Sequence, residues 1–319
     1  MNQPNAQQKG RDFAPSHSQK LQGNHSVTYH QAQSDFIDAM AAGGIAPADP
    51  GAIIADGELH RFRIEGDKRG SRNGYFILHM DGIPAGHFGS WKHGVSQSWC
   101  AINRDSLTPE QREDNRRRME ASRKAAADLR AQQNRSAADR AAYIWDRAKP
   151  APADFPYLVN KGIQPGIARI KGDVLVLPVT DVEGNMRSLQ FIGEEGSKRF
   201  LTGGQKKACF IVVNDPDNAR RIMICEGFAT GATLAEHDTT ATVIAALDAG
   251  NLEPVALAIR GEHPTADIVI AMDFDEVGRA KGEQAARAIG AKALPPPVNV
   301  PEWVTDWNDY AALVQGGEQ

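Results

Sequence analysis

The chain has 319 residues, of which 24% are charged and 41% hydrophobic, and its formal net charge at pH 7 is −4. This length is enough for two domains, each with its own hydrophobic core. The longest apolar runs are far shorter than the roughly 20 residues that a membrane-spanning helix needs, and the first residues lack the basic and then apolar order of a secretory signal. We therefore expect a cytoplasmic protein with no membrane partner.

The three cysteines, Cys100, Cys209 and Cys225, lie far apart in the sequence. Because no pair has the Cys-x-x-Cys spacing, we expect reduced thiols and no zinc site. Charge is divided unevenly: residues 226–319 carry 15 acidic and 5 basic side chains, and residues 1–225 carry 25 acidic and 31 basic ones. Two ordinary solvated surfaces are one explanation. An acidic metal-binding half beside a basic half that meets phosphates is the other.

The chain begins with a polar segment, residues 1–32, that is rich in Gln, Asn, Ser and His, and we expect it to be a disordered tail. Residues 33–103 are different, because a short helix pattern from Ser34 is followed by strand-like runs with glycine-rich turns between them. These runs are 59–64, 74–80 and 85–91. The order predicts a small α+β domain at the N-terminus.

Two tryptophans of this domain, Trp91 and Trp99, lie near several basic residues. The basic residues are Arg61, Arg63, Lys68, Arg69, Arg72 and Lys92. Rings that stack on bases and cations that meet phosphates suit the binding of single-stranded nucleic acid. The alternative is that each tryptophan belongs to the core of a small domain.

Residues 104–149 are expected to form a helical connector. Thr108-Pro109-Glu110-Gln111 is typical of a helix start, with Thr108 as the N-cap and Pro109 at the first helical position. No Pro or Gly follows until Pro150, and large apolar residues are scarce before Tyr143. A helix this polar is more often a solvated connector than a binding surface, although Arg116-Arg117-Arg118 could contact a phosphate backbone.

Residues 150–216 are expected to form a β-rich, basic subdomain. An apolar run at 173–179 and another at 188–192 flank a turn, and a basic segment follows with Gly203-Gly204 inside it. The basic residues are Lys198, Arg199, Lys206 and Lys207. A glycine pair allows the backbone to approach a ligand closely, and an ordinary basic hairpin tip is the alternative.

Carboxylates follow two apolar runs in residues 217–319. Residues 221–225 end at Glu226, and residues 267–272 end at Asp273 and Asp275. Such runs are typical of strands buried on both faces of a parallel sheet, and ligands bind beyond the carboxyl ends of those strands. Like charges ~4 Å apart repel by about 4 kcal/mol at intermediate dielectric. The convergence therefore predicts a Mg²⁺ or Mn²⁺ site.

The segments between and after these runs complete an α/β pattern. Helices are expected at about 229–237, 251–260 and 278–289, and strands at 241–245 and from 291. A Pro295-Pro296-Pro297 break then precedes Asp306-Trp307-Asn308-Asp309. The fold class that we expect is α/β and α+β multidomain, with a central parallel sheet in the C-terminal domain.

The motif around Glu226 resembles the Toprim domain, which bacterial primases, type IA and type II topoisomerases and some nucleases share. The resemblance rests on Glu226-Gly227-Phe228-Ala229-Thr230-Gly231, on Asp273-Phe274-Asp275 and on Gly278. The first segment is similar to the Glu-Gly-Tyr-Ala-Thr-Ala motif of primases from conjugative plasmids and satellite phages. It differs by Phe228 for Tyr and by Gly231 for Ala. The similarity covers roughly residues 143–313.

The resemblance implies a DNA primase that makes short RNA primers on single-stranded DNA from ribonucleoside triphosphates, for a plasmid, conjugative element or prophage. Asp273 and Asp275 would be metal ligands, and Glu226 an acid/base or a further ligand. Asp306 and Asp309 would complete the acidic cluster. The motif glycines are Gly227, Gly231 and Gly278. By the same resemblance, Lys198, Arg199, Lys206 and Lys207 would face nucleotide phosphates or template.

Other functions are compatible with the same residues. A Toprim nuclease would use the acids with water as the nucleophile, and a single-strand-binding protein could keep the fold without catalysis. A topoisomerase fits worst, because it needs a nucleophilic tyrosine in a large additional domain. These 319 residues contain no Gly-x-x-x-x-Gly-Lys-Ser/Thr segment, so we expect no P-loop helicase within them. A separate replicative helicase stays open as a partner.

Overall fold

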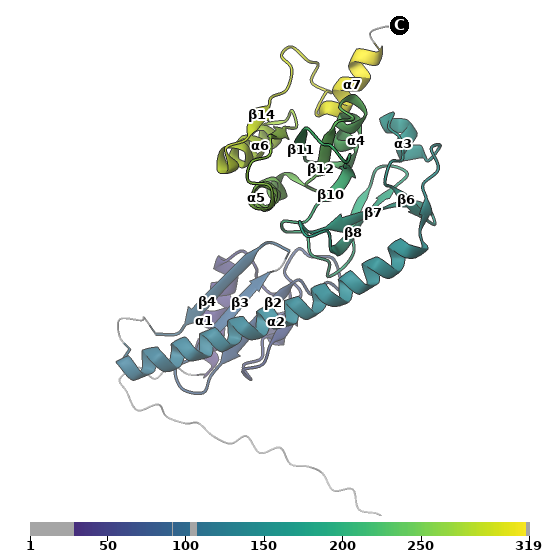
Figure 1. Ribbon diagram of the computed structural model, residues 1–319. Coiled ribbons are helices and arrows are strands. Elements are labelled where there is room, and N and C mark those ends of the chain that lie inside the picture. Colours follow the sequence, from purple (N-terminus) through teal and green to yellow (C-terminus); the bar gives the residue numbers. More distant parts are fainter. Residues whose placement is uncertain (1–28, 91, 103–106, 317–319) are drawn as a thin grey trace, which may run out of the picture. The chain divides into compact units, whose positions relative to one another are not determined.

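The computed structural model describes residues 29–90, 92–102 and 107–316. The chain divides into two compact units, residues 1–129 and 130–319, and the boundary falls within helix α2 (Pro109–Arg147) (Figure 1). Trp91 and residues 1–28 of the expected disordered tail lie outside the described residues, whereas residues 29–32 of that segment are helical, so the disorder expected for them is wrong. Within the described residues, no helix combines the length and the apolar character needed to cross a membrane.

The first unit is an antiparallel sheet covered by a helix. Its elements are α1 (Tyr29–Ala42), the short η1 (Pro50–Ala52), β1 (His60–Phe62), β2 (Gly74–His79), β3 (Ala85–Ser90) and β4 (Val95–Cys100). The strands pair in chain order. Phe36 of α1 packs edge-on against Phe76 and Phe88 of the sheet and is fully buried. A side chain at Gly86 would collide with Phe36, which explains a glycine inside β3.

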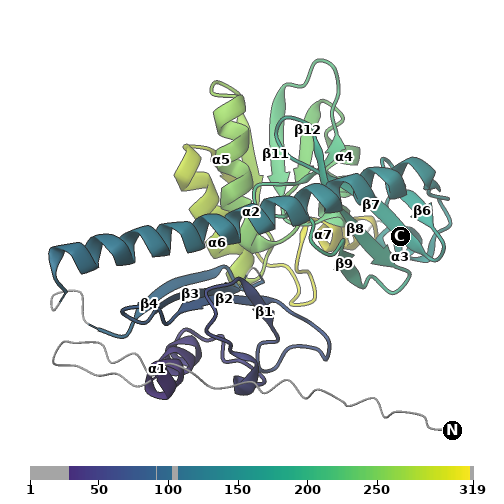
Figure 2. The ribbon, with the colours of Figure 1, turned by 90° about the horizontal axis from the view of Figure 1, so that it is seen from below.

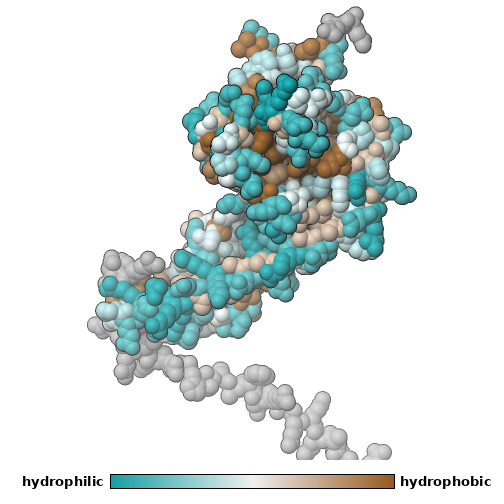
Figure 3. Space-filling view, in the orientation of Figure 1, coloured by the Kyte–Doolittle hydropathy of each residue, from teal (hydrophilic) through white to brown (hydrophobic). Residues whose placement is uncertain are grey.

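Helix α2 begins as the sequence predicts. The backbone N–H of Gln111 donates to Thr108 Oγ1 (3.2 Å), and that of Thr108 donates to Gln111 Oε1 (2.9 Å), which is a reciprocal capping box. The segment is one helix of 39 residues, and its outer face is hydrophilic (Figure 3). Arg116 and Arg117 both pair with Glu113 within the helix, at 2.8 and 3.0 Å. These arginines therefore already have an acidic neighbour.

The second unit contains two five-stranded sheets. The first is antiparallel in chain order and consists of β5 (Lys149–Pro150), β6 (Arg169–Lys171), β7 (Val174–Thr180), β8 (Met186–Gly193) and β9 (Lys198–Phe200), with α3 (Pro156–Lys161) between β5 and β6. The side chains of β7 alternate between the two faces of this sheet. Val176 packs with Ala141 of α2, whereas Leu175 and Leu177 face the other sheet of the unit. This antiparallel sheet thus lies between α2 and the rest of the unit.

The other sheet has the order β10-β12-β11-β13-β14. Its strands are β10 (Ile211–Asn214), β11 (Arg221–Cys225), β12 (Ala241–Ala245), β13 (Ile268–Ala271) and β14 (Lys292–Leu294), and β10 alone among them pairs antiparallel. The helices that follow the parallel strands are α4 (Phe228–His237), α5 (Leu252–Glu262) after the short η3 (Ala249–Asn251), α6 (Glu276–Ile289) and α7 (Trp307–Gly316). The predicted central parallel sheet is confirmed.

Helices cover both faces of this sheet (Figures 1 and 2). Ile222 and Ile224 of β11 pack with α5 and α6 in one core, and Met223 and Cys225 pack with α4 in the other. The second core also contains Leu175 from the antiparallel sheet. Because the two sheets of the second unit share this core, the basic strand β9 is held in one body with the carboxyl ends of β11 and β13.

We predict that residues 130–319 fold as an independent fragment and that residues 150–319 do not fold as stably. The shorter fragment lacks the part of α2 that covers Val176 and Leu189, which are fully buried in the structure. Exposing two such side chains costs about 3 kcal/mol or more. Urea unfolding of both fragments, followed by tryptophan fluorescence and circular dichroism, measures the difference. Equal midpoints would show that this part of α2 does not belong to the core.

Candidate functional site

The candidate site lies beyond the carboxyl ends of two neighbouring parallel strands. Strands β11 and β13 pair in parallel, with Ile224 opposite Ile270. Glu226 follows β11 directly, and Asp273 follows β13 after one further residue. The pairing register therefore brings both carboxylates to the same edge of the sheet. The charge of Glu226 therefore acts directly on Asp273.

Asp273 is the most electrostatically unusual group in this cluster. Its Oδ1 is buried and has no hydrogen-bond partner among the described residues. Burial, and after it the nearby charges of Glu226, Asp306 and Asp275, together raise the pKa of Asp273 to about 8. Lys198 acts in the opposite direction. A buried carboxylate oxygen with no donor is an oxygen that a cation can use.

Glu226 is in a similar environment. Burial raises its pKa, and the charges of Asp275 and Asp248 raise it further. Lys198 and a hydrogen bond from the backbone N–H of Ala249 oppose the rise. Glu226 therefore accepts a proton more readily than an exposed glutamate does, which is the property that a general acid/base needs.

Asp275 has a structural bond in addition to its place in the cluster. It is the N-cap of α6, and its Oδ1 accepts the backbone N–H of Gly278 at 2.6 Å. A Cβ on Gly278 would lie 2.8 Å from the Cβ of Asp273. A glycine is therefore needed where α6 begins against the acidic turn. This gives a packing reason for the predicted motif glycine.

The other two motif glycines lie at the start of α4. Gly231 would bring a Cβ to 3.0 Å from Val213 Cγ2 and 3.2 Å from Cys225 Sγ, so that a small residue lets α4 lie close to the sheet. Gly227 is the N-cap residue of α4, and a Cβ there would be 3.6 Å from Lys198 Nζ. The ammonium of Lys198 is thus next to the turn that carries Glu226.

Helix α7 braces the turn that carries the two aspartates. The backbone N–H of Phe274 donates to the carbonyl of Thr305 (2.7 Å), and Trp307 Nε1 donates to the carbonyl of Met272 (3.1 Å). The Phe274 ring packs edge-on against Trp307, with 5.3 Å between centroids. These contacts fix the backbone on both sides of Asp273.

The carboxylates of the two aspartates at the start of α7 bond to different partners. Asp306 is at the helix start, where its Oδ1 accepts the backbone N–H groups of Asn308 and Asp309 at 2.8 and 2.9 Å, and its charge still reaches Asp273. Asp309 instead accepts hydrogen bonds from Thr305 and pairs with Lys161 at 3.2 Å. Burial alone would raise the pKa of Asp309, but these contacts hold it below its usual value. The structure does not bring Asp309 into the cluster.

The predicted basic residues lie on β9 and the loop after it. Lys198 and Arg199 are exposed on β9, and Lys207 is exposed in the loop. Lys206 is engaged, because its Nζ lies 2.7 Å from Asp248 Oδ2 and 4.2 Å from the centroid of the Phe200 ring. The loop is therefore tied to the parallel sheet rather than free in solvent.

Of the two tryptophans, the structure describes the side chain of Trp99. It packs edge-on against Phe36 at 5.4 Å between centroids and contacts the core of the first unit. This contact favours the alternative in which Trp99 supports the core. Trp91 lies outside the described residues.

Asp248 and Asn251 are candidate residues that the sequence analysis missed as part of the site. Asp248 comes in the turn after β12, the parallel neighbour of β11, although Glu226 follows its strand directly and Asp248 comes after Ala246 and Leu247. A carboxylate shortly after an apolar run predicts Asp273 as a site residue. The apolar run 241–245, followed by Asp248, has the same pattern. The sequence predicts Asn251 only as the start of a helix.

The residues fit a hard cation in part. No group of three or more His, Cys, Asp or Glu residues in the described chain has ready metal-ligand geometry. However, carboxylate oxygens are the ligands that Mg²⁺ and Mn²⁺ prefer, and Asp273 Oδ1 is buried without a partner. Glu226, Asp273, Asp275 and Asp306 are the residues whose carboxylates could hold such an ion.

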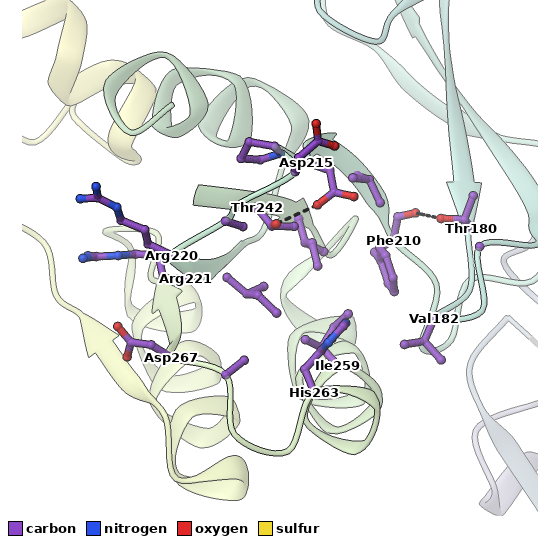
Figure 4. Close-up of a pocket in the computed structure, with 18 of the residues that line it drawn as sticks. Thr180, Val182, Phe210, Asp215, Arg220, Arg221, Thr242, Ile259, His263 and Asp267 are labelled. Carbon is purple, nitrogen blue, oxygen red and sulfur yellow. Dashed lines mark hydrogen bonds between the residues drawn. The ribbon is translucent and has the colours of Figure 1, made fainter. Parts of the chain in front are cut away.

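A cavity of about 530 Å³ lies at the opposite edge of the same sheet (Figure 4). Arg221 at the start of β11 and Asp267 just before β13 line it, together with Phe210 and Ile259. None of the predicted catalytic residues is in its wall. Because ligands of parallel sheets bind at the carboxyl ends of the strands, this cavity does not define the catalytic site despite its size.

Comparison with known proteins gives the class of this fold. Residues 221–317 match the family described as Toprim domain. The match covers the parallel sheet from β11 onward, the acidic cluster and α7. The C-terminal part of the chain is therefore a Toprim domain, as its motifs predict.

The relatives are more specific. The chain is 34% identical over 280 residues to DNA primase TraC of Escherichia coli, which covers 83% of this chain and 26% of that protein. It is also 34% identical over 284 residues to a second DNA primase TraC of Escherichia coli. That match covers 83% of this chain and 19% of the relative. The chain is thus similar to these two TraC primases and spans about a quarter or less of their length.

Solved structures give a weaker likeness. The primase fragment of the bacteriophage T7 primase-helicase protein is 19% identical, with a TM-score of 0.42, and the match covers 51% of this chain and 72% of that one. A DnaG primase catalytic domain bound to single-stranded DNA is 13% identical, with a TM-score of 0.39, and the match covers 59% and 77%.

In the absence of divalent cations, Asp273→Asn should stabilise the protein at neutral pH. The pKa of Asp273 is 3.8 in its ordinary state and about 8 in the fold, so the folded chain holds an extra proton between these values and loses stability as pH rises. Asparagine does not ionise. We expect a gain of about 1–3 kcal/mol near pH 7.5, discounted for partial exposure, and none near pH 4.

Urea unfolding of both proteins in a chelator, at several pH values, measures this gain. Asp267→Asn is the matched control, because Asp267 lies at the other end of β13 and its hydrogen bond with Lys292 lowers its pKa. That variant should lose stability at neutral pH. A gain for Asp273→Asn that does not change with pH would contradict the assigned environment.

Proposed function

We propose that the protein is a DNA primase that synthesises short RNA primers on single-stranded DNA by metal-dependent nucleotidyl transfer, for a plasmid, conjugative element or prophage. The observation that carries the proposal is Asp273: a buried, unpartnered carboxylate oxygen beside Glu226 and Asp306, with the ammonium of Lys198 close by. The relationship to the TraC primases supports it.

The acidic residues have distinct roles in this proposal. Asp273, Asp275 and Asp306 would hold Mg²⁺ or Mn²⁺, with Glu226 as a further ligand or as the acid/base. When bound, the ion neutralises phosphate charge and activates a hydroxyl group. Asp309 would act indirectly, because its bonds to Thr305 and Lys161 hold the start of α7 in place. We expect no zinc.

The basic residues would bind the substrates. The charge of Lys198 acts on both Glu226 and Asp273, and Lys198 would meet the phosphates of a ribonucleoside triphosphate. Arg199, Lys206 and Lys207 would extend this contact toward the nucleotide or the template. Their place on β9 and its loop, in the same body as the Toprim domain, favours a primase over a nuclease, which needs no nucleotide-binding strand beside its acids. A separate helicase stays an open partner.

The domain organisation belongs to the same proposal. Residues 150–216 and 217–319 would form the catalytic module, and residues 33–103 would be a separate module for single-stranded DNA. The arginines of the first unit support this role, although Arg61 already donates to the carbonyl of Arg72. Residues 104–149 would connect the two modules.

We predict that Asp273→Asn abolishes primer synthesis while leaving the fold intact. The side chain keeps its size and loses the charge that would hold a cation. The measurement is incorporation of labelled ribonucleotides on circular single-stranded DNA in Mg²⁺, resolved on a sequencing gel. Asp267→Asn, at the other end of the same strand, should keep full activity. Wild-type turnover by Asp273→Asn would show that the metal assignment is wrong.

We also predict that Lys206→Ala/Lys207→Ala weakens binding of template or nucleotide. Each lost contact with a single strand should flatten the log–log dependence of affinity on salt by about 0.7. Fluorescence anisotropy with a labelled oligonucleotide, over a series of salt concentrations, gives the slope. Lys171→Ala on β6 is the matched control for removal of a surface lysine. An unchanged slope together with unchanged nucleotide affinity would make the loop an ordinary hairpin tip.

A further inference from the structure

The side chain of Asn251 joins two segments that are about 45 residues apart in the sequence. It is 5% exposed, and its Nδ2 donates to the carbonyls of Cys209 and Ala246 at 2.8 Å and of Lys206 at 3.0 Å. Its Oδ1 accepts the backbone N–H of Ala208 at 3.0 Å. The amide is thus bonded at both ends, and three of its four partners belong to the loop after β9.

Both segments have backbone conformations that their residues rarely adopt. Ala208 has φ of 57° and Leu247 has φ of 81°, in the left-handed region that favours glycine. Such conformations persist where surrounding contacts determine them, and they gather at functional sites. Asn251 bonds directly to Ala208 and to Ala246, next to Leu247. It is therefore the group that holds both segments in these conformations.

The turn that contains Asn251 also contacts the candidate site. The backbone N–H of Ala249 donates to the carboxylate of Glu226. Asp248 accepts the backbone N–H of Asn251 at 3.1 Å through Oδ1 and the ammonium of Lys206 at 2.7 Å through Oδ2. A single short turn after β12 thus contacts Glu226 on one side and the basic loop on the other.

We propose that Asn251 is a positioning residue that fixes the loop of residues 202–209 to the turn after β12, so that Lys206 and Lys207 are held at the turn that contacts Glu226, ready to receive nucleotide phosphates. Asp248 holds the Lys206 ammonium in this place until a phosphate takes over the contact. The phosphate part of this inference rests on the proposed primase function. The fixed position of the loop does not depend on it.

The test uses the full chain and Asn251→Ala. Loss of the amide removes the partner of the Ala208 N–H and leaves the carbonyl of Lys206 with the backbone N–H of Cys209 alone, so the loop should open more often. Amide hydrogen exchange at Ala208 should become at least about tenfold faster, while amides of β11 and β13 stay protected. In primer synthesis, KM for ribonucleotides should rise about tenfold, with kcat within about twofold of wild type.

The matched control is Asn214→Ala, which removes a side-chain bond to the carbonyl of Ala241 at the opposite edge of the same sheet. It should change neither Ala208 exchange nor KM. A purely structural loss at Asn251 would lower the active fraction, and thus the apparent kcat, without a change in KM. If Asn251→Ala fails to fold, Asn251→Ser, which keeps one donor, replaces it with the same expectations in a weaker form.

The outcomes separate the two proposals. If the wild type makes primers and Asn251→Ala changes neither Ala208 exchange nor KM, the positioning role is overturned and the primase function stands. If the wild type makes no primers, the primase function fails, and exchange at Ala208 still decides whether Asn251 holds the loop. Exchange that is faster throughout β11 and β13 as well would overturn the local role.

Discussion

The repulsion among carboxylates at one edge of the parallel sheet is the constraint on which the rest of the second unit depends. Adjacent parallel strands end at the same edge, so pairing β11 with β13 brings Glu226 and Asp273 together whatever the surroundings are. Burial, and after it the charge of neighbouring carboxylates, raises the pKa of both groups, so this arrangement costs folding free energy at neutral pH when no cation is present. Such a cost is typical of a site that a ligand relieves.

The surrounding structure holds the acids in place despite this cost. Hydrophobic cores pack against both faces of β11 and β13. Thr305, just before α7, and Trp307, its first residue, bond to the backbone on the two sides of Asp273. Because the antiparallel sheet shares one of these cores, Lys198 is held near the acids as a fixed positive charge. The same packing therefore supplies both the acidic cluster and its basic counterpart.

Much of this arrangement could be predicted from the sequence, because apolar strands followed by acids are a local pattern. The strands that carry Glu226 and Asp273 and the capping box at Thr108 follow from such patterns. The same pattern is present at Asp248, but its contact with Lys206 and the contacts of Asn251 could not be predicted, since they join residues about 45 positions apart. The sequence does not decide whether Trp99 belongs to the core or to the surface, because this depends on its contact with Phe36.

The pair Asp306 and Asp309 shows why a spacing in sequence does not define a ligand set. At a helix start, the N-cap side chain accepts backbone N–H groups two and three positions on, and the third helical residue reaches back toward the preceding turn. Asp306 makes the first kind of bond and Asp309 the second, to Thr305. Their carboxylates diverge for this reason, and Lys161 then neutralises Asp309. The helix geometry that leaves Asp306 beside Asp273 thus turns the carboxylate of Asp309 away from the acidic cluster.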